Sequence, residues 1–327
     1  MLPARFEWTR RHALSAIMIG GTVGFGRGEA SAAAPMLGPA RPRHYRFELG
    51  RFEVTMLLDA EAAIDGPWPV IGSNSSQAEV DRLMSDNLLP THKYQPGFTP
   101  MIVNTGEQLI LFDTGNGAKG FVPHPYGGWL VDVLAPAGFA AEAIDLVVLS
   151  HGHPDHIGGM FENGRPLFPN ARYTIGQVEY DFWARERGHS GPLEAFAALF
   201  REYVVPVADR TSFLKPGAEV ARGIRTVEAY GHTPGHLCFH LESEGERLFF
   251  LGDCCHHHVA SLARPDWHTV FDTDPIQGAA TRARMFDMLA TERIAVSAFH
   301  MPFPSLGFVE RQGSGYRWVQ HSYQLTL

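Results

Sequence analysis

The chain has 327 residues, of which 45% are hydrophobic, and a formal net charge of −8 at pH 7. This length and hydrophobic fraction allow one large core or two smaller ones. The negative charge argues against nucleic acid as the main partner, because binding to phosphate backbones requires basic patches.

The first 34 residues are expected to form an export signal that takes no part in the fold. Arg10 and Arg11 precede a weakly apolar stretch interrupted by glycines, and the small residues Ala30-Ser31-Ala32 follow. A basic start, an apolar middle and a small-residue cleavage site are typical of such signals. The arginine pair resembles the twin-arginine type, which implies the twin-arginine export machinery as a partner and a periplasmic or secreted location. A disordered cytoplasmic extension is the alternative.

The apolar stretch of residues 1–34 is too short and too rich in glycine to span a bilayer, so we expect no membrane span. Cleavage of the signal is expected after Ala32 or Ala34. Residues 35–44 are rich in proline and alanine and are expected to form a linker. The rest of the chain, residues 45–327, is expected to fold as a single domain.

Short apolar runs alternate with amphipathic stretches along this domain, which predicts strands alternating with helices. The predicted strands are 45–49, 52–58, 101–104, 109–112, 145–149, 173–176, 224–229, 237–242, 247–251, 294–298, 308–310 and 316–319. The predicted helices are 76–89, 129–137, 177–185, 193–203 and 275–290. Such an alternation in two halves favours an α/β fold of two sheets with helices outside them.

The densest group of potential metal ligands follows the predicted strand 145–149. From Ser150 to Gly159 the sequence is Ser-His-Gly-His-Pro-Asp-His-Ile-Gly-Gly, which supplies three imidazoles and one carboxylate. These side chains suit zinc or a similar divalent ion. Because Pro154 and the glycine pair interrupt regular structure, we expect the ligands to lie on a loop at the end of the strand.

Three later residues are candidates for the same site. His232, Asp253 and His300 each lie just beyond the end of a predicted strand, as the first histidine of the dense group does. Since several strand ends of one sheet meet at the same edge, we expect all these side chains to lie close together.

The spacing His-x-His-x-Asp-His resembles the signature of the metallo-β-lactamase superfamily. This resemblance implies an αββα fold, a four-layer sandwich of two mixed β-sheets flanked by helices. It also implies two divalent metal ions, which we expect to be Zn²⁺, and a metal-bridging hydroxide as the nucleophile. By resemblance, the first ion is held by His151, His153 and His232, and the second by Asp155, His156 and His300. Asp253 would bridge the two ions, which makes Asp155 and Asp253 the catalytic carboxylates.

Further motifs resemble methyl parathion hydrolase and its lactonase relatives, among them Phe112-Asp113-Thr114-Gly115 and Asp181-Phe182-Trp183. The resemblance implies a hydrophobic substrate pocket, for which the candidates are Trp183, Phe121 and Phe196. Ordinary core aromatics are the alternative.

Two polar residues near the candidate ligands also take a role from this resemblance. Asp113 would fix the tautomer of a ligand histidine, or alternatively would cap a turn. His256 occupies the position where acyl-homoserine lactonases have a tyrosine. It is a further candidate for the substrate pocket, where it would donate a proton in place of that tyrosine.

We therefore expect a dinuclear metallohydrolase that cleaves a small neutral lactone or aryl ester. The alternative within enzymes is an organophosphate triester hydrolase. Alternatives from other classes are a metal-binding protein without turnover and a redox protein that uses Cys254 and Cys255. The three cysteines, which include Cys238, are too few for a disulfide framework, and neighbouring cysteines rarely bridge, so all three are predicted to be buried apolar residues. A homodimer is left open.

Overall fold

The computed structural model describes Met36, Gly38 and residues 40–323. The predicted export signal, residues 1–34, and residues 35, 37 and 39 of the predicted linker 35–44 therefore lie outside the described residues. No helix in the described part of the chain is long and apolar enough to cross a membrane. The segment Pro42–Leu327 forms one compact unit, and it contains every element discussed below.

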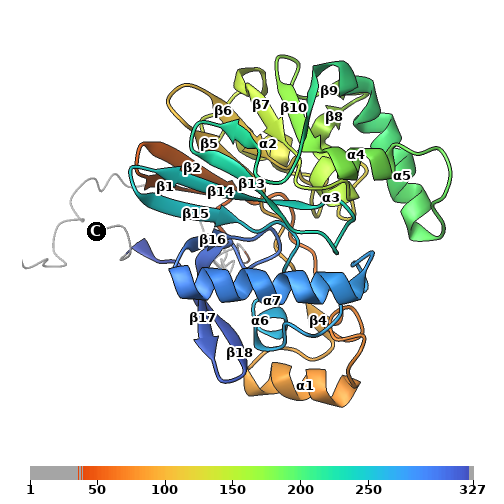
Figure 1. The fold of residues 1–327 in the computed structure, drawn as a ribbon, viewed down its shortest axis with the longest axis vertical. Helices are drawn as coiled ribbons and strands as arrows, with labels where there is room; N and C mark the ends of the chain where they lie inside the picture. Colours follow the sequence, from red (N-terminus) through yellow and green to blue (C-terminus); the bar gives the residue numbers. More distant parts are fainter. Residues whose placement is uncertain (1–35, 37, 39, 324–327) are drawn as a thin grey trace, which may run out of the picture. The chain divides into compact units, whose positions relative to one another are not determined.

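The first sheet is built almost entirely from the first half of this unit (Figure 1). Its strands are β1 (His44–Leu49), β2 (Phe52–Leu57), β5 (Met101–Asn104), β6 (Leu109–Phe112), β7 (Leu146–Val148), β10 (Arg172–Gly176) and β11 (Thr211–Leu214). They lie in the order β1-β2-β5-β6-β7-β10-β11. The pairs β6–β7, β7–β10 and β10–β11 are parallel and the other pairs are antiparallel, so the sheet is mixed.

The second sheet is built from the second half. Its strands are β12 (Glu219–Ala221), β13 (Ile224–Glu228), β14 (Leu237–Ser243), β15 (Glu246–Phe250), β16 (Ala295–Ser297), β17 (Leu306–Gln312) and β18 (Gly315–Gln320), which are neighbours in chain order. Only β15 and β16 pair in parallel, because the long helix α7 (Pro275–Glu292) connects them. The other pairs are antiparallel.

Shorter elements cover the outer faces of the two sheets and fill the connections. The remaining helices are α1 (Gln77–Asp86), α2 (Leu130–Leu134), α3 (Pro154–Ile157), α4 (Gln177–Trp183), α5 (Pro192–Tyr203) and α6 (Ala260–Ala263). The 3₁₀ helices are η1 (Ala141–Ala143), η2 (Gly158–Met160) and η3 (Val205–Arg210), and two-stranded ribbons join β3 (Ile64–Asp65) to β4 (Lys93–Tyr94) and β8 (Phe161–Glu162) to β9 (Arg165–Pro166).

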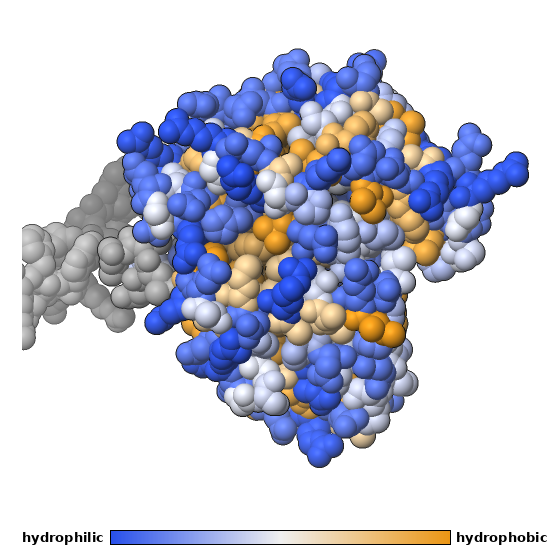
Figure 2. All heavy atoms as spheres, viewed as in Figure 1, coloured by the Kyte–Doolittle hydropathy of each residue, from blue (hydrophilic) through white to orange (hydrophobic). Residues whose placement is uncertain are grey.

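Three buried clusters show that the layers are stacked as a sandwich. One lies between the sheets, where Phe112 of the first packs against Phe239 and Phe250 of the second, with ring centroids 5.3 Å apart in both pairs. A second joins the outer face of the first sheet to α2, α3 and α5, and a third joins the second sheet to α7. The predicted four-layer α/β sandwich is thereby confirmed. Figure 2 shows mostly hydrophilic residues on one face, with apolar residues in separate patches.

Most predicted elements are present, and the differences have local causes. The predicted helix 129–137 ends at Leu134, because Pro136 has no backbone N–H to donate to the carbonyl of Asp132 and Gly138 follows with a positive φ of 90°. The strands β11 and β12 were not predicted. They are edge strands whose residues are half-buried or exposed, so they carry no continuous apolar run.

Asp59, just after β2, anchors the loops that lead to the strand ends. Its buried carboxylate accepts hydrogen bonds from the backbone N–H and side-chain amide of Asn116, at 2.7 and 2.9 Å, and from the N–H of Leu130 at 2.9 Å. Burial raises the pKa of Asp59 to about 6, against the lowering effect of these three bonds. One carboxylate thus joins the end of β2 to the loop after β6 and to the start of α2.

We expect Asp59→Ala to lower the free energy of unfolding by about 3 kcal/mol or more, because three buried donors lose their acceptor at about 1–3 kcal/mol each. Urea unfolding of the variant measures this change. Asp65→Ala is the control: Asp65 is exposed and pairs only with exposed Lys93, so its loss should change stability by less than about 0.5 kcal/mol. Equal stability of the two variants would contradict the anchoring role.

Candidate metal centre

Seven side chains converge at the ends of four strands and form two adjoining groups. The first group is His151, His153, His232 and Asp253, and the second is Asp155, His156, Asp253 and His300. In each group the candidate ligand atoms lie within 4.8 Å of one another, and all of the residues are buried. The structure therefore brings together every residue that the sequence assigned to metal binding, with Asp253 shared by both groups.

The shared carboxylate lies between the groups and contacts imidazoles of both. Asp253 Oδ2 lies 3.3 Å from His232 Nε2, a member of the first group. Asp253 Oδ1 lies 3.2 Å from His156 Nε2 in the second group. The same Oδ2 is 3.0 Å from His300 Nε2. A carboxylate in this position can offer an oxygen to each of two cations.

Buried acceptors fix the tautomers of two of the first group's imidazoles. The carboxylate of Asp272 lies 3.0 Å from His232 Nδ1 and accepts a hydrogen bond from its N–H, which leaves a lone pair on Nε2. Ser150 Oγ donates to Asp113 and so accepts from His151 Nδ1 at 3.0 Å, with the same result for His151. The two Nε2 atoms face each other at 3.2 Å. Two imidazole nitrogens held this close to each other fit the ligand shell of a single cation.

The second group is held in the same way. Asp113 Oδ2 lies 2.8 Å from His156 Nδ1, and the carbonyl oxygen of Gly97 lies 2.7 Å from His300 Nδ1. Both rings therefore direct their Nε2 atoms at the carboxylates of Asp155 and Asp253. His156 Nε2 and Asp253 Oδ1 are buried without a hydrogen-bond partner. Nitrogen and carboxylate donors arranged like this fit a divalent cation.

The three histidines of the first group stay neutral at pH 7. Burial lowers the pKa of His151, His153 and His232 well below the usual value, and neighbouring imidazoles add to the effect. Neutral imidazole is the form that binds metals.

The segment 150–159, which carries four of the seven candidate ligands, is more regular than predicted. Residues Pro154–Ile157 form the short helix α3, with Pro154 in its first turn, where the missing N–H of proline has no cost. Asp155 and His156 therefore lie on a helical turn, and the expectation of an irregular loop is wrong for them. A Cβ on Gly158 or Gly159 would lie 2.0 Å from the carbonyl oxygen of Asn116 or Thr114, so the glycine pair lets this turn pack closely against the loop after β6.

A buried glutamate on α4, which the sequence analysis missed, joins two of the ligand loops. Glu179 Oε1 accepts from the N–H of Gly152, between His151 and His153, at 2.8 Å. Glu179 Oε2 accepts from Thr233 Oγ1 and from the N–H of Gly235, beside His232, at 2.7 and 2.8 Å. Burial raises the pKa of Glu179, and these hydrogen bonds oppose the rise. One carboxylate thus fixes the spacing of three candidate ligands.

A cavity of about 230 Å³ opens onto both groups. Its polar lining consists of side chains of the site together with His256, and the rest of its wall is formed by Ile64, Tyr94, Pro96, Phe98, Phe121, Val122 and Phe271. No lysine or arginine lines it, so the cavity suits a small neutral molecule with apolar parts.

The predicted pocket residues occupy different places. Phe121 and His256 line the cavity. Phe196 packs behind this wall, with its ring centroid 5.3 Å from that of Phe121 and 5.4 Å from that of His153. Trp183 does not line the cavity, which corrects the prediction: it is fully buried and donates its ring N–H to Glu179 at 2.6 Å.

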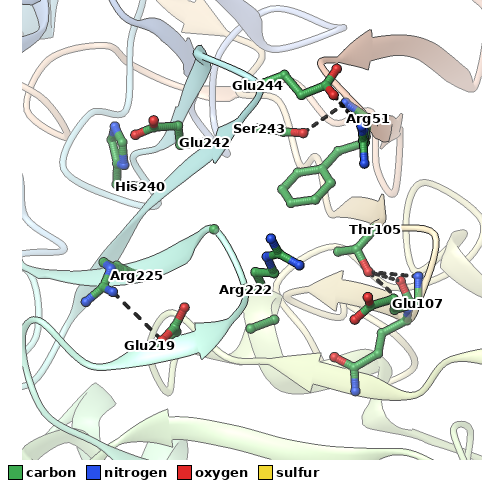
Figure 3. A pocket seen from close by; sticks show the side chains of 14 residues that line it. Arg51, Thr105, Glu107, Glu219, Arg222, Arg225, His240, Glu242, Ser243 and Glu244 are labelled. Carbon is green, nitrogen blue, oxygen red and sulfur yellow. Dashed lines mark hydrogen bonds and ion pairs between the residues drawn. The ribbon is translucent and has the colours of Figure 1, made fainter.

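A larger groove of about 620 Å³ lies between hairpin ends of the two sheets and contains none of the candidate ligands (Figure 3). Its lining carries both signs of charge, and several of these charges pair with one another. Arg51 pairs with Glu244, and Arg225 lies 3.8 Å from Glu219. The converging imidazoles and carboxylates make the smaller cavity the functional site.

Comparisons with known proteins agree with this geometry. The family model of the metallo-β-lactamase superfamily matches residues 99–296. The chain is similar to AidC, a dizinc quorum-quenching lactonase solved in complex with a product, with 28% identity and a TM-score of 0.76, covering 86% of this chain and 98% of that one. It is also similar to the hydrolase AbOPH of the β-lactamase superfamily, with 26% identity and a TM-score of 0.80, covering 87% and 99%.

One relative is named for a different activity from that of the lactonase AidC. An atrochrysone carboxyl ACP thioesterase from Passalora fulva is 30% identical to this chain over 158 residues. The match covers 48% of this chain and 38% of that protein, so the chain spans well under half the length of this relative.

We expect Glu179→Gln to weaken metal binding by about 10–100-fold, the usual effect of losing a group that orients ligands. The amide NH₂ cannot accept the two hydrogen bonds that one carboxylate oxygen accepts, so one ligand loop loses its anchor. Titration against a competing chelator measures the affinity. Asp181→Asn on the same helix is the control, because Asp181 is exposed and bonds only Gln177. Unchanged affinity in Glu179→Gln would refute the role of this carboxylate.

Proposed function

The chain belongs to the metallo-β-lactamase superfamily of metal-dependent hydrolases, and on this basis we propose that it uses two metal ions to hydrolyse a small neutral lactone. One observation carries the proposal: two ligand groups that share Asp253 lie at the base of a small, mostly apolar cavity.

In this proposal each residue group has a defined task. His151, His153 and His232 would hold one ion, Asp155, His156 and His300 would hold the other, and Asp253 would be shared by the two. The donors are imidazole nitrogens and carboxylate oxygens without a thiolate, which suits Zn²⁺. When bound, the ions supply Lewis acidity that activates water and polarises the substrate's carbonyl group. Asp113, Asp272 and the carbonyl of Gly97 hold the ligand rings in the required tautomers.

The cavity favours a neutral substrate, because its wall offers aromatic and aliphatic side chains and no cationic group that would pair with a charged phosphate. A lactone, an aryl ester and a phosphate triester all meet this condition. The similarity to the lactonase AidC extends over 86% of the chain, whereas the match to the fungal thioesterase covers about half of it. We therefore place lactones first, with phosphate triesters of the methyl parathion type as the alternative.

His256 is the residue best placed to donate a hydrogen bond to the substrate. It lines the cavity, and its Nε2 lies 3.5 Å from Asp253 Oδ2. Both ring nitrogens are buried without a hydrogen-bond partner, and the ring is stacked on that of His300. A lactone oxygen bound over Asp253 would give this imidazole N–H its missing acceptor.

The cellular location of the protein is proposed from the sequence alone. Residues 1–34 would direct the protein through the twin-arginine machinery, which exports folded proteins, to the periplasm. Such a route would allow the metals to bind before export.

We expect the zinc-loaded protein to contain two ions per chain and to cleave a short-chain acylated γ-lactone. The kcat/KM for this lactone should be at least about tenfold above the values for p-nitrophenyl acetate, a dialkyl aryl phosphate triester and an acyl thioester. A tenfold difference corresponds to about 1.4 kcal/mol of transition-state binding. Metal analysis and a hydrolysis panel measure both quantities. A faster triester or thioester would change the substrate class, and a single ion would refute the dinuclear centre.

The ligand assignment is tested separately with Asp253→Asn. Because an amide offers one oxygen where the carboxylate offers two, we expect lower metal content and a loss of more than about 100-fold in activity, beyond the effect of losing an orienting partner. Asp86→Asn, an exposed position on α1, should leave metal content and activity unchanged. Retention of two ions and full activity by Asp253→Asn would refute the shared role.

For His256→Phe we expect kcat for the lactone to fall by about 100-fold, at the low end of the contribution of a positioned proton donor. Metal content should not change, because the ring shape and its stacking are kept. His240→Phe, in the groove of Figure 3, is the control for the same substitution away from the site. Parallel loss of metal and activity would make His256 a ligand and not a donor.

A further inference from the structure

A cluster of thiols lies directly behind the shared carboxylate. Cys238 on β14 and Cys254, which follows Asp253 in the chain, have their Sγ atoms 3.6 Å apart. The third thiol, Cys255, points elsewhere and contacts Met301 Sδ at 3.9 Å. All three are buried and unbridged. The pair of thiols close enough to react is therefore Cys238 with Cys254, whereas the redox alternative in the sequence analysis named Cys254 and Cys255.

His236 lies beside this pair, so the cluster also has the composition of a third metal site. The hydrogen bonds of His236 argue against that use. Its Nε2 accepts from the backbone N–H of Asp253 at 3.2 Å, so the proton of a neutral ring is on Nδ1, which donates to the carbonyl of Ala229 at 3.1 Å. Nδ1 is the nitrogen nearer to Cys254 Sγ, at 4.0 Å, and it has no free lone pair for a metal.

We propose that Cys238 and Cys254 are an oxidation site that closes reversibly to a disulfide, and that this disulfide loosens the metal centre. The second part rests on the proposed function of Asp253. Closing the bond brings the two Sγ atoms from 3.6 Å to about 2.05 Å, the length of an S–S bond.

The oxidant is a peroxide, which is small enough to reach a buried thiol when the site fluctuates. One thiol attacks hydrogen peroxide, the O–O bond breaks, and a sulfenic acid and one water are formed. The second thiol then attacks the sulfenic sulfur, its proton leaves with the hydroxyl group as a second water, and the S–S bond forms. Two thiols are oxidised and one peroxide is reduced to two waters. A dithiol reductant reverses the reaction by exchange.

The disulfide acts on the metal centre through the backbone. Cys254 is bonded directly to Asp253, and its carbonyl accepts from the buried Arg282 Nε at 2.8 Å. Arg282 also holds Asp272, the acceptor that orients His232. A shift of Cys254 toward β14 therefore moves the shared carboxylate and disturbs the partner of a second ligand. Misplacement of orienting groups weakens metal binding by about 10–100-fold.

To test this proposal, the zinc-loaded full chain is treated with hydrogen peroxide and then alkylated under denaturing conditions. Peptide mapping by mass spectrometry should show a crosslink between Cys238 and Cys254, with Cys255 as the one alkylated thiol. Zinc affinity, measured with a competing chelator, should fall by about tenfold or more and recover after dithiothreitol. Cys255→Ser should behave like the parent protein, and Cys238→Ser should form no crosslink and keep its zinc affinity after peroxide.

Each other outcome overturns a defined part of the proposal. Three alkylated thiols, a crosslink that includes Cys255, or over-oxidation without a crosslink would refute the oxidation site. A crosslink with unchanged zinc affinity would refute the coupling to Asp253 alone. A third zinc ion that is lost in Cys238→Ser would make the cluster a metal site. The crosslink is measured without reference to turnover, so failure of the lactone assay does not affect it.

Discussion

The candidate site depends on buried oxygens that accept hydrogen bonds from the outer nitrogens of its histidine rings. Asp113, Asp272 and the carbonyl of Gly97 each accept a hydrogen bond from one Nδ1–H group, and the Nε2 atoms face inward. Glu179 then sets the distance between the loop of His151 and the loop of His232. These acceptors place mutually repelling lone pairs and carboxylates within hydrogen-bond distance. Imidazole nitrogens and carboxylates gathered in this way fit divalent cations, so the geometry of the site supports metal binding.

The two-sheet sandwich explains how residues from distant parts of the chain arrive there. The first sheet delivers the segment after β7, and the second delivers His232, Asp253 and His300 beyond β13, β15 and β16. The inter-sheet core, with Phe112 packed on Phe239 and Phe250, holds the two sets in register. Displacement of one sheet against the other would separate the ligands of each group. The packing between the sheets therefore also fixes the geometry of the site.

The candidate metal ligands could be predicted from the sequence, but most of the residues that hold these ligands in place could not. Histidines and aspartates at short spacing, each after an apolar strand, carry a strong local signal. Glu179 lies in the helix sequence Gln-Val-Glu-Tyr, which resembles any amphipathic helix, and its partners lie 27 and 56 residues away. Asp272 is 40 residues from His232 and lies among turn residues. Only Asp113 was inferred, because its motif follows a strand end. Contacts of this range arise from the packing of layers and leave no periodic pattern.

The substrate wall has a different origin from the ligands, and this limits what membership of the superfamily implies. Ile64, Tyr94, Phe98, Phe121 and Phe271 come from connections outside the two large sheets. Loops tolerate substitution and insertion more readily than strand ends that meet in a packed sandwich. The reaction type is therefore tied to the sheets, whereas the choice of substrate depends on segments that differ freely among relatives. A lactonase and a thioesterase can for this reason both be similar to this chain, and the shape and charge of its own cavity must decide between their substrates.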